Sequence, residues 1–187
     1  YVTTASRKKE RIQEAPANIT VLTQAQIQEL GVSSLAEVLS FIPGITVIES
    51  HFGYTDVVFR GIYQELNNKG LMLINGHPAW DVIHGSYHLE QIPVDAIKQI
   101  EVIRGPGSVL YGTNAYAGVI NIITYDGSEK NINKAGIKGG SFSTQEYALS
   151  GGSKIEDFSM FASASYYDTN GYEYRIKADE LGQSGIL

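Results

Sequence analysis

The hydrophobic residues of this chain follow two different patterns, and the change between them lies near Asp126. Before that point, apolar residues recur at helical spacing in two short segments, and an unbroken apolar run such as Leu71–Ile74 indicates a strand that is buried on both faces. After it, helical spacing stops and apolar residues alternate with small polar ones, which is typical of strands with two different faces. We therefore expect a compact α+β unit followed by a part made of β-hairpins.

Two capping boxes predict the starts of two short helices. The first joins Thr23 to Gln26, and the second joins Ser34 to Glu37. The residues that follow each box present one apolar face, and a helix of this kind has to pack on another element, for which a sheet is the natural partner. Gly31 is suited to end the first helix, because glycine readily adopts the left-handed conformation.

Short runs of β-branched and apolar residues predict strands at 18–22, 45–48, 57–59, 71–74, 99–104 and 119–124. We expect them to supply a small mixed four-stranded sheet. Asn75-Gly76 is a strong signal for a tight turn, and Pro93 is suited to open a short helical turn. The glycines and the proline of 105–118 predict a segment without any regular element.

In the second part, alternation is clearest in Phe158–Tyr167 and weaker near 135–142 and 144–151. Alternating segments of about ten residues, joined by turns and with aromatic residues near their ends, are typical of transmembrane β-barrel strands. A soluble β-meander explains the same pattern about equally well. The 61 residues after Asp126 have room for roughly four such strands. Because a barrel in lipid has to close, the first interpretation predicts an incomplete barrel.

Composition excludes several classes of function. The chain has 14 Lys and Arg against 20 Asp and Glu, a net charge of −6, and without a basic patch we expect no nucleic-acid partner. It has no cysteine and therefore no disulfide or thiolate metal site. No apolar run is long enough for a transmembrane helix, and the opening residues indicate a mature or trimmed start. The motifs G-x-S-x-G and H-E-x-x-H are missing, so we expect no enzyme.

Four segments, in matching order and spacing, resemble the plug domain of TonB-dependent outer-membrane receptors. They are ITVLTQAQIQELGVSSLAEVLSFIPGITV, FRG at 59–61, LMLINGHP, and IPVDAIKQIEVIRGPGSVLYGTNAYAGVINIIT. The resemblance runs from about Val2 to Thr124, and the remainder is similar to the first hairpins of the family's barrel. It implies a flexible N-terminal arm at 1–17, a plug domain at 18–125, and the first strands of a 22-stranded transmembrane β-barrel, here truncated, at 126–187.

The resemblance also implies a location and partners. The plug would lie inside a barrel in the outer membrane of a Gram-negative bacterium, with the N-terminus in the periplasm. TonB, together with its inner-membrane energising complex, would grip an N-terminal segment and pull. Tyr1, Val2, Thr3 and Thr4 resemble the end of that segment, a partial TonB box, and a disordered tail is the alternative. No cofactor and no resident metal are implied.

Substrate contacts are implied on the apical plug loops, at 49–56, 80–88 and 111–116. The residues expected to contact substrate are His51, Phe52, Trp80, His84, Tyr87, His88, Tyr111 and Tyr116. His84 and His88 have a spacing that could chelate a metal on a helix, but the Gly85-Ser86 between them makes a helix doubtful. Such a surface suits a ferric siderophore or similar iron chelate. A haem or cobalamin receptor of the same family, or a free-standing soluble binding or signalling module, are the alternatives.

Arg60 and Arg104 occupy positions where the family has buried plug arginines that face acidic groups of the barrel wall. A buried and unpaired charge costs several kcal/mol, so we expect both guanidinium groups to be partly exposed or paired within the plug. Outside a complete barrel, Phe158–Tyr167 would have an unpaired edge and an exposed apolar face, which favour pairing or aggregation with other chains. We expect this segment to be disordered, folded back on the plug or paired between copies of the chain.

Overall fold

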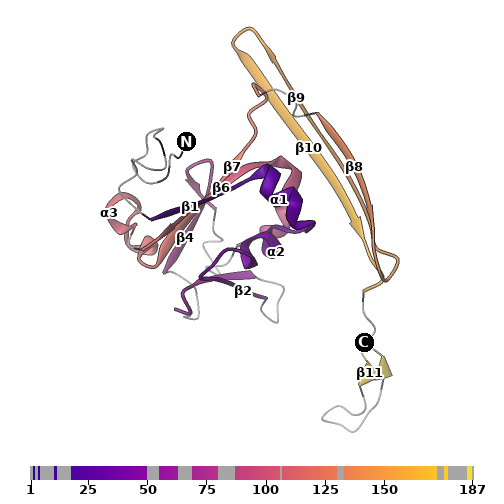
Figure 1. The fold of residues 1–187 in the computed structure, drawn as a ribbon, viewed down its shortest axis with the longest axis horizontal. Helices are drawn as coiled ribbons and strands as arrows, with labels where there is room; N and C mark the ends of the chain where they lie inside the picture. Colours follow the sequence, from indigo (N-terminus) through magenta and orange to yellow (C-terminus); the bar gives the residue numbers. More distant parts are fainter. Residues whose placement is uncertain are drawn as a thin grey trace.

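The computed structural model describes residues 2, 4, 11, 18–49, 55–62, 69–79, 87–105, 107–129, 133–171, 175–176 and 185–186. Two groups of elements stand apart in Figure 1. In the first, short helices pack on a sheet, and all its elements precede residue 125. In the second, a long and narrow sheet is formed by residues that follow 133. The hydrophobic pattern of the sequence changes between these two groups.

Five strands form the first sheet, in the order β1-β6-β7-β4-β5. Their bounds are β1 Ile19–Thr23, β4 Gly70–Ile74, β5 His77–Pro78, β6 Ile97–Arg104 and β7 Gly118–Thr124. β4 runs parallel to β7, and all other neighbours are antiparallel. The predicted mixed sheet is confirmed, with one two-residue strand more than expected. This extra strand follows from the tight turn at Asn75 (φ 50°) and Gly76 (φ 83°), which returns the chain onto β4.

Helices α1 (Gln24–Leu30) and α2 (Leu35–Ser40) cover one face of this sheet. Both predicted capping boxes are present, and α1 ends at Gly31 with φ 68°. The buried side chains of this layer come from the two helices and the three inner strands, and they include Ile27, Leu35, Val38, Leu39, Met72, Ile97, Ile100, Val102, Ile120 and Ile122. Among the described residues, no helix combines the length and the apolar character that crossing a membrane requires.

Strands β2 (Ile45–Glu49) and β3 (Thr55–Phe59) form a separate antiparallel pair. Its last residue, Phe59, places its ring against Gly70 and Gly118, which are register partners in β4 and β7. A Cβ atom would come within 2.1 Å of the ring at Gly70 and within 2.5 Å at Gly118. The ring occupies the space of both missing side chains, so these two positions require glycine.

The glycine-rich segment 105–118 is not irregular, so the expectation from its composition is wrong. It contains α3 (Ser108–Tyr111) and the 3-10 turn η3 (Thr113–Ala115). The carbonyl of Gly107 accepts the backbone N–H groups of Leu110 and Tyr111, each at 3.0 Å, and Gly112 has a φ of 84°. Frequent glycines prevent long helices, but single turns can form because a glycine with positive φ supplies the bend between them.

Tyr87 joins β4 to the loop that precedes two 3-10 turns, η1 (Leu89–Gln91) and η2 (Val94–Ala96). Its side chain is only 3% exposed. The hydroxyl donates to the carbonyl of Gly70 at 2.8 Å and accepts the N–H of Met72 at 3.3 Å. Burial raises the pKa of Tyr87 to about 12, because the ionised phenolate would lose its hydration.

The second sheet contains three long antiparallel strands in the order β10-β9-β8. They are β8 (Lys134–Gly139), β9 (Gln145–Ile155) and β10 (Phe158–Asp168), and they reach well beyond the first group of elements in Figure 1. β11 (Arg175–Ile176) and β12 (Gly185–Ile186) form a further short pair. The predicted antiparallel hairpins are confirmed. The described residues contain three long strands and one short pair, where roughly four strands were expected.

Strand β10 contains the segment for which we expected disorder, back-folding or pairing between copies. Disorder is the wrong expectation, because β10 is a regular strand that pairs with β9 along its whole length. The hydrogen bonds to β9 satisfy the backbone groups along one edge of β10, and they form whether or not the faces of the strand are covered. Its apolar face is indeed uncovered, since Met160 is 58% exposed. An ordered strand is therefore compatible with an uncovered apolar face.

Residues 125–129 tie the second sheet to the first body. The N–H of Tyr125 donates to the carbonyl of Ala96 at 3.1 Å, and its ring centroid lies 5.6 Å from that of Phe161 in β10. The Nζ of Lys98 in β6 lies 2.5 Å from a carboxylate oxygen of Glu129. Residues of this connection therefore contact both the first body and the second sheet.

The close approach of Phe59 predicts the effect of adding one methyl group. We expect Gly118→Ala to lower the free energy of unfolding by about 1–3 kcal/mol, because the new Cβ forces the ring or the strand to shift. Gly136→Ala is the matched control: this glycine also lies in a strand, and nothing is within 4 Å of its added Cβ. Chemical denaturation of both variants measures the difference, and equal stabilities would contradict the packing argument.

Tyr87 predicts a loss of stability at alkaline pH. Between pH 10 and about 12 the unfolded chain ionises at this position while the folded chain does not, so the free energy of unfolding falls as the pH rises. Tyr87→Phe should cost about 1–2 kcal/mol at pH 7, because two hydrogen bonds are lost. The variant should then lose about 2 kcal/mol less than the parent on going from pH 10 to 12. Urea denaturation across this range tests it, and parallel curves would be the contrary result.

Candidate functional site

The structure describes part of each predicted group of site residues. His51, Phe52, Trp80, His84, Tyr1 and Thr3 lie outside the described residues. The predicted positions that can be placed are Tyr87, His88, Tyr111 and Tyr116 of the substrate group, Val2 and Thr4 of the N-terminal group, and Arg60 and Arg104 of the plug–barrel group.

The four described candidates for substrate contact lie in different environments. His88 and Tyr116 are exposed, and the Nδ1 atom of His88 is 3.2 Å from an oxygen of Glu90. Tyr87 belongs to the core, where its hydroxyl is engaged by backbone groups. Tyr111 is half-buried, and its hydroxyl donates to the carbonyl of Thr4 at 2.8 Å. Only His88 and Tyr116 therefore present an accessible side chain, and substrate contact by any of the four stays a prediction.

Val2 and Thr4 are both buried, and Thr4 lies against the sheet face opposite to the helices. Thr4 is 1% exposed, and its N–H and hydroxyl both donate to Oε2 of Glu101, at 2.8 and 2.5 Å. The hydroxyl also accepts from the side-chain amide of Asn121 at 3.1 Å. A disordered tail, the alternative for this part of the chain, does not describe these two residues.

Glu101 is a residue that the sequence argument missed. Ile100 and Val102 of β6 belong to the core, whereas Glu101 lies on the opposite face and is 0% exposed. It stands in register with Asn121 of β7. A signal was available, because an acidic residue in the middle of a strand that is buried on both faces must find partners inside the protein.

Arg60 and Arg104 lie side by side rather than apart. A guanidinium N–H of Arg60 donates to the backbone carbonyl of Arg104 at 3.3 Å, and Arg104 donates to the hydroxyl of Thr20 in β1. Arg60 is exposed and Arg104 is half-buried, with an Nε atom that has no partner in the described part of the chain. The expectation of partial exposure or pairing within the plug is confirmed. Contact of either residue with a barrel wall stays a prediction.

The second sheet has one apolar and one polar face. Strand alternation and register place most of the large apolar side chains on one face: Ile137, Tyr147, Leu149, Ile155, Phe158, Met160 and Tyr166. This face is open, and Leu149, for example, is 65% exposed. The opposite face is mainly polar and carries Lys134, Lys138, Glu146, Ser150, Ser163 and Ser165, together with the aromatic residues Phe161 and Tyr167. The rings of Tyr147 and Tyr166 pair near one end of the apolar face, with centroids 6.4 Å apart.

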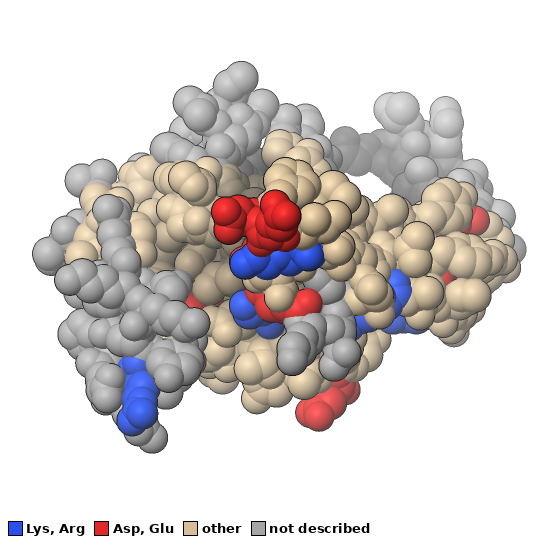
Figure 2. All heavy atoms as spheres, turned by 90° about the horizontal axis from the view of Figure 1, so that it is seen from above, with Lys and Arg blue, Asp and Glu red and all other residues tan. Residues whose placement is uncertain are grey.

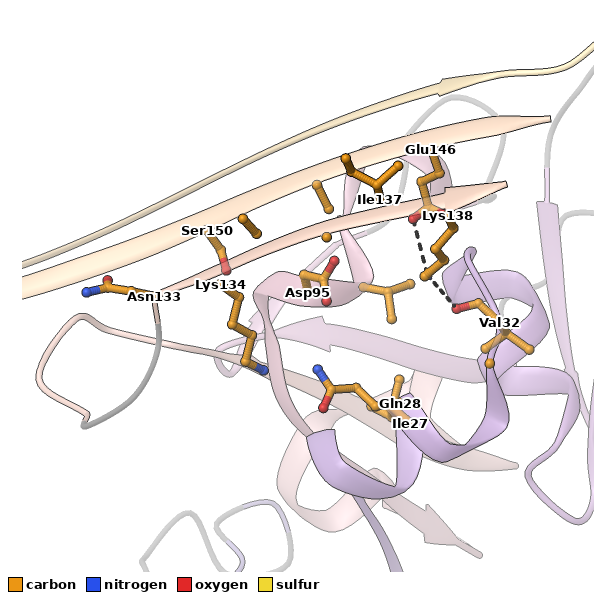
Figure 3. A pocket seen from close by; sticks show the side chains of 15 residues that line it. Ile27, Gln28, Val32, Asp95, Asn133, Lys134, Ile137, Lys138, Glu146 and Ser150 are labelled. Carbon is orange, nitrogen blue, oxygen red and sulfur yellow. Dashed lines mark hydrogen bonds and ion pairs between the residues drawn. The ribbon is translucent and has the colours of Figure 1, made fainter. Parts of the chain in front are cut away.

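The polar face of this sheet is turned toward the helical body. Figure 3 shows Lys134 and Lys138 reaching from β8 toward α1 and η2. The Nζ of Lys138 lies 3.3 Å from Oε1 of Glu146, and it also donates to the carbonyl of Val32 and the hydroxyl of Ser33, at 3.5 and 3.4 Å. A cavity of about 570 Å³ lies beside this contact, between the second sheet on one side and α1 and η2 on the other. The sheet therefore meets the helical body through a polar, incompletely filled seam.

Charges are sparse on the described surface that Figure 2 presents. Most of the described atoms there belong to uncharged residues. Acidic and basic side chains stand next to one another near the centre of the view and singly elsewhere, and they form no large patch of one sign. In the described part of the chain, no group of three or more His, Cys, Asp or Glu is placed to hold a metal ion.

Comparisons with known proteins agree with this architecture. The family profile of the TonB-dependent receptor plug domain matches residues 11–119. The chain is 34% identical over 190 residues to the vitamin B12 transporter BtuB of Vibrio vulnificus strain CMCP6, which covers 97% of the chain and 29% of that protein. It is 37% identical over 134 residues to an iron-regulated outer membrane virulence protein of Vibrio cholerae (strain ATCC 39541), which covers 66% of the chain and 19% of that protein.

A solved structure shares the fold. The ferripyoverdine receptor of the outer membrane of Pseudomonas aeruginosa, bound to ferripyoverdine, superposes with a TM-score of 0.69 at 20% sequence identity, over 90% of this chain and 22% of that one. The chain spans less than a third of the length of each of these proteins. The matching profile, the identities and the shared fold establish that the chain belongs to the family of TonB-dependent outer-membrane receptors and contains their plug domain.

Proposed function

We propose that the chain supplies the plug and the first wall strands of a transporter in the outer membrane of a Gram-negative bacterium. In this arrangement residues 1–17 form an N-terminal arm on the periplasmic side, of which Thr4 is held against the plug; residues 18–125 form the plug, and residues 126–187 form the start of a 22-stranded barrel that surrounds it. The observation that carries the proposal is the two-faced sheet β8–β10. Its open face is apolar with aromatic residues toward both ends, and its other face is mainly polar, apart from Phe161 and Tyr167, and lies against the plug, as in a lipid-facing barrel wall.

The transporter works by a change of conformation rather than by chemistry on its cargo. Solute binding at the outer loops and pulling by TonB, driven by its inner-membrane complex, bias the plug between a closed and a permissive arrangement. The polar seam supports this view, because Lys138, Glu146 and Ser33 form contacts that can exchange for water when the plug shifts. An apolar interface of the same size would resist such an exchange.

The cargo is a large metal chelate that binds at the outer loops, and two candidates follow from different relatives. Cobalamin is favoured by the 34% identity to a vitamin B12 transporter over nearly the whole chain. A ferric siderophore is favoured by the iron-regulated relative and by the fold shared with a ferripyoverdine receptor. The exposed side chains of His88 and Tyr116 suit contact with either chelate.

Uptake by whole cells distinguishes the two cargoes. Deleting the gene should abolish TonB-dependent uptake of radiolabelled cyanocobalamin, and a plasmid copy should restore it only in cells that have TonB. If uptake of cobalamin is unchanged and uptake of a ferric siderophore falls, the second candidate is correct. If both are unchanged, neither cargo is right.

The membrane assignment predicts opposite outcomes for two adjacent residues of β10. Ala164 and Ser165 are both small and exposed, but Ala164 lies on the apolar face and Ser165 on the polar face near Glu146. A lysine on the lipid face costs about 2–4 kcal/mol near the bilayer midplane. We therefore expect Ala164→Lys to reduce the heat-modifiable, folded protein in outer-membrane fractions several-fold, and Ser165→Lys to leave it near the parent level. In a soluble meander both variants would be tolerated alike.

A further inference from the structure

Two cavities meet in the seam between the second sheet and the helical body. The first, of about 570 Å³, is the cavity beside Lys138. The second, of about 310 Å³, lies between η1, η2 and the start of α2 on one side and β9 and β10 on the other. Glu146 of β9 and Asp95 of η2 line both. Figure 3 shows Glu146 on the side of the sheet and Asp95, which is half-buried, on the side of the helical body.

Glu146 has one carboxylate oxygen without a donor. The residue is 8% exposed, and its Oε1 atom lies 3.3 Å from Nζ of Lys138. Its Oε2 atom is buried and accepts no hydrogen bond from the described residues. A buried carboxylate oxygen that lacks a donor is costly, because it has lost its hydration and gained nothing in exchange. A donor that enters the cavity therefore restores a missing interaction.

The smaller cavity, which we call the acidic cavity, is lined by four carboxylates: Glu37, Glu90, Asp95 and Glu146. No Lys or Arg is among the described residues that line it. Two of the four carboxylates already have partners, since Glu37 accepts the backbone N–H groups of its capping box and Glu90 contacts the ring of His88. The two that line both cavities, Glu146 and Asp95, are thus the ones best placed to take a further cation.

The rest of the lining suits a cation with an organic body. Tyr167 of β10 contributes an aromatic ring, and the face of such a ring attracts alkylammonium groups. The apolar part of the lining comes from the helical body: Leu35, Leu89, Ile92, Pro93 and Val94. A bare metal ion would leave these side chains unused. In the described part of the chain, moreover, no three or more His, Cys, Asp or Glu side chains converge to hold one.

We propose that the acidic cavity binds a small organic ammonium ion. Its nitrogen lies between Glu146 and Asp95 and donates to Oε2 of Glu146, and its alkyl part contacts Tyr167 and the apolar lining. Because Glu146 belongs to the second sheet and Asp95 to the helical body, the bound cation joins the two across the seam. This site is separate from the outer loops proposed to bind cargo, and its occupation requires neither cargo nor TonB.

Calorimetric titration of the full-length protein in detergent and amine-free phosphate buffer tests the site. The probe is n-butylammonium chloride, and n-butanol is its uncharged counterpart. We expect saturable binding of one n-butylammonium ion, at least tenfold tighter than that of n-butanol. Glu146→Gln keeps the shape and removes the charge, so it should weaken binding about tenfold or more. Tyr167→Leu keeps an apolar side chain without the ring and should weaken it about two- to fivefold.

Glu29→Gln is the matched control, because it removes an exposed carboxylate of α1 that lines neither cavity, and it should leave the affinity unchanged. Glu146→Gln also alters the contact with Lys138, so its thermal unfolding is measured alongside. If this variant does not fold, Asp95→Asn takes its place, and Tyr167, which is 58% exposed, tests the cavity without touching that contact.

Three results would overturn the site: no saturable binding to the parent, equal affinity for n-butylammonium and n-butanol, or an affinity that neither the carboxylate variant nor Tyr167→Leu changes. The measurement contains no transport step. Failure of the transporter proposal would instead appear in membrane assembly and uptake, so the two failures can be told apart.

Discussion

The structure depends on the burial of β6 and β7 on both faces. On one side the two capped helices pack against Ile100, Val102, Ile120 and Ile122. On the other side the covering layer consists of α3, η3 and the segment with Val2 and Thr4. Strands that are buried on both faces have no solvated side on which to place polar groups. The buried polar residues Glu101 and Asn121 must therefore be satisfied from inside, and Thr4, Gln99 and the N–H of Gly76 supply their partners.

The second sheet obeys a different constraint. Its strands β8, β9 and β10 pair with one another and present opposite characters on their two faces. The apolar face is exposed, whereas the polar face meets the plug through Lys138, Glu146 and a cavity. This is the reverse of a soluble protein, in which the apolar face of a sheet lies against the core. Family membership and this inverted arrangement together explain why a sheet with such an open apolar face occurs in the protein.

Several elements could be predicted from the sequence because their causes are local. Both capping boxes, the left-handed stop at Gly31 and the tight turn at Asn75-Gly76 depend on residues within a few positions of one another, and all are present. The glycine-rich segment was the exception, since composition alone does not reveal that single turns survive between glycines. The site residues were harder, because Tyr87 was taken for a loop aromatic and is a core residue with both hydroxyl contacts made by backbone.

The sequence by itself determined the family, the order of the first two helices and the main strands, and the alternation that separates the two faces of the second sheet, because motifs and periodicity are properties of neighbouring residues. Only the tertiary structure decided that Thr4 meets Glu101, that Arg60 lies beside Arg104, and that the polar face of β8–β10 is the one turned toward the plug. These contacts join residues far apart in the chain. Which of them form depends on how the sheets stack, and no local pattern records that.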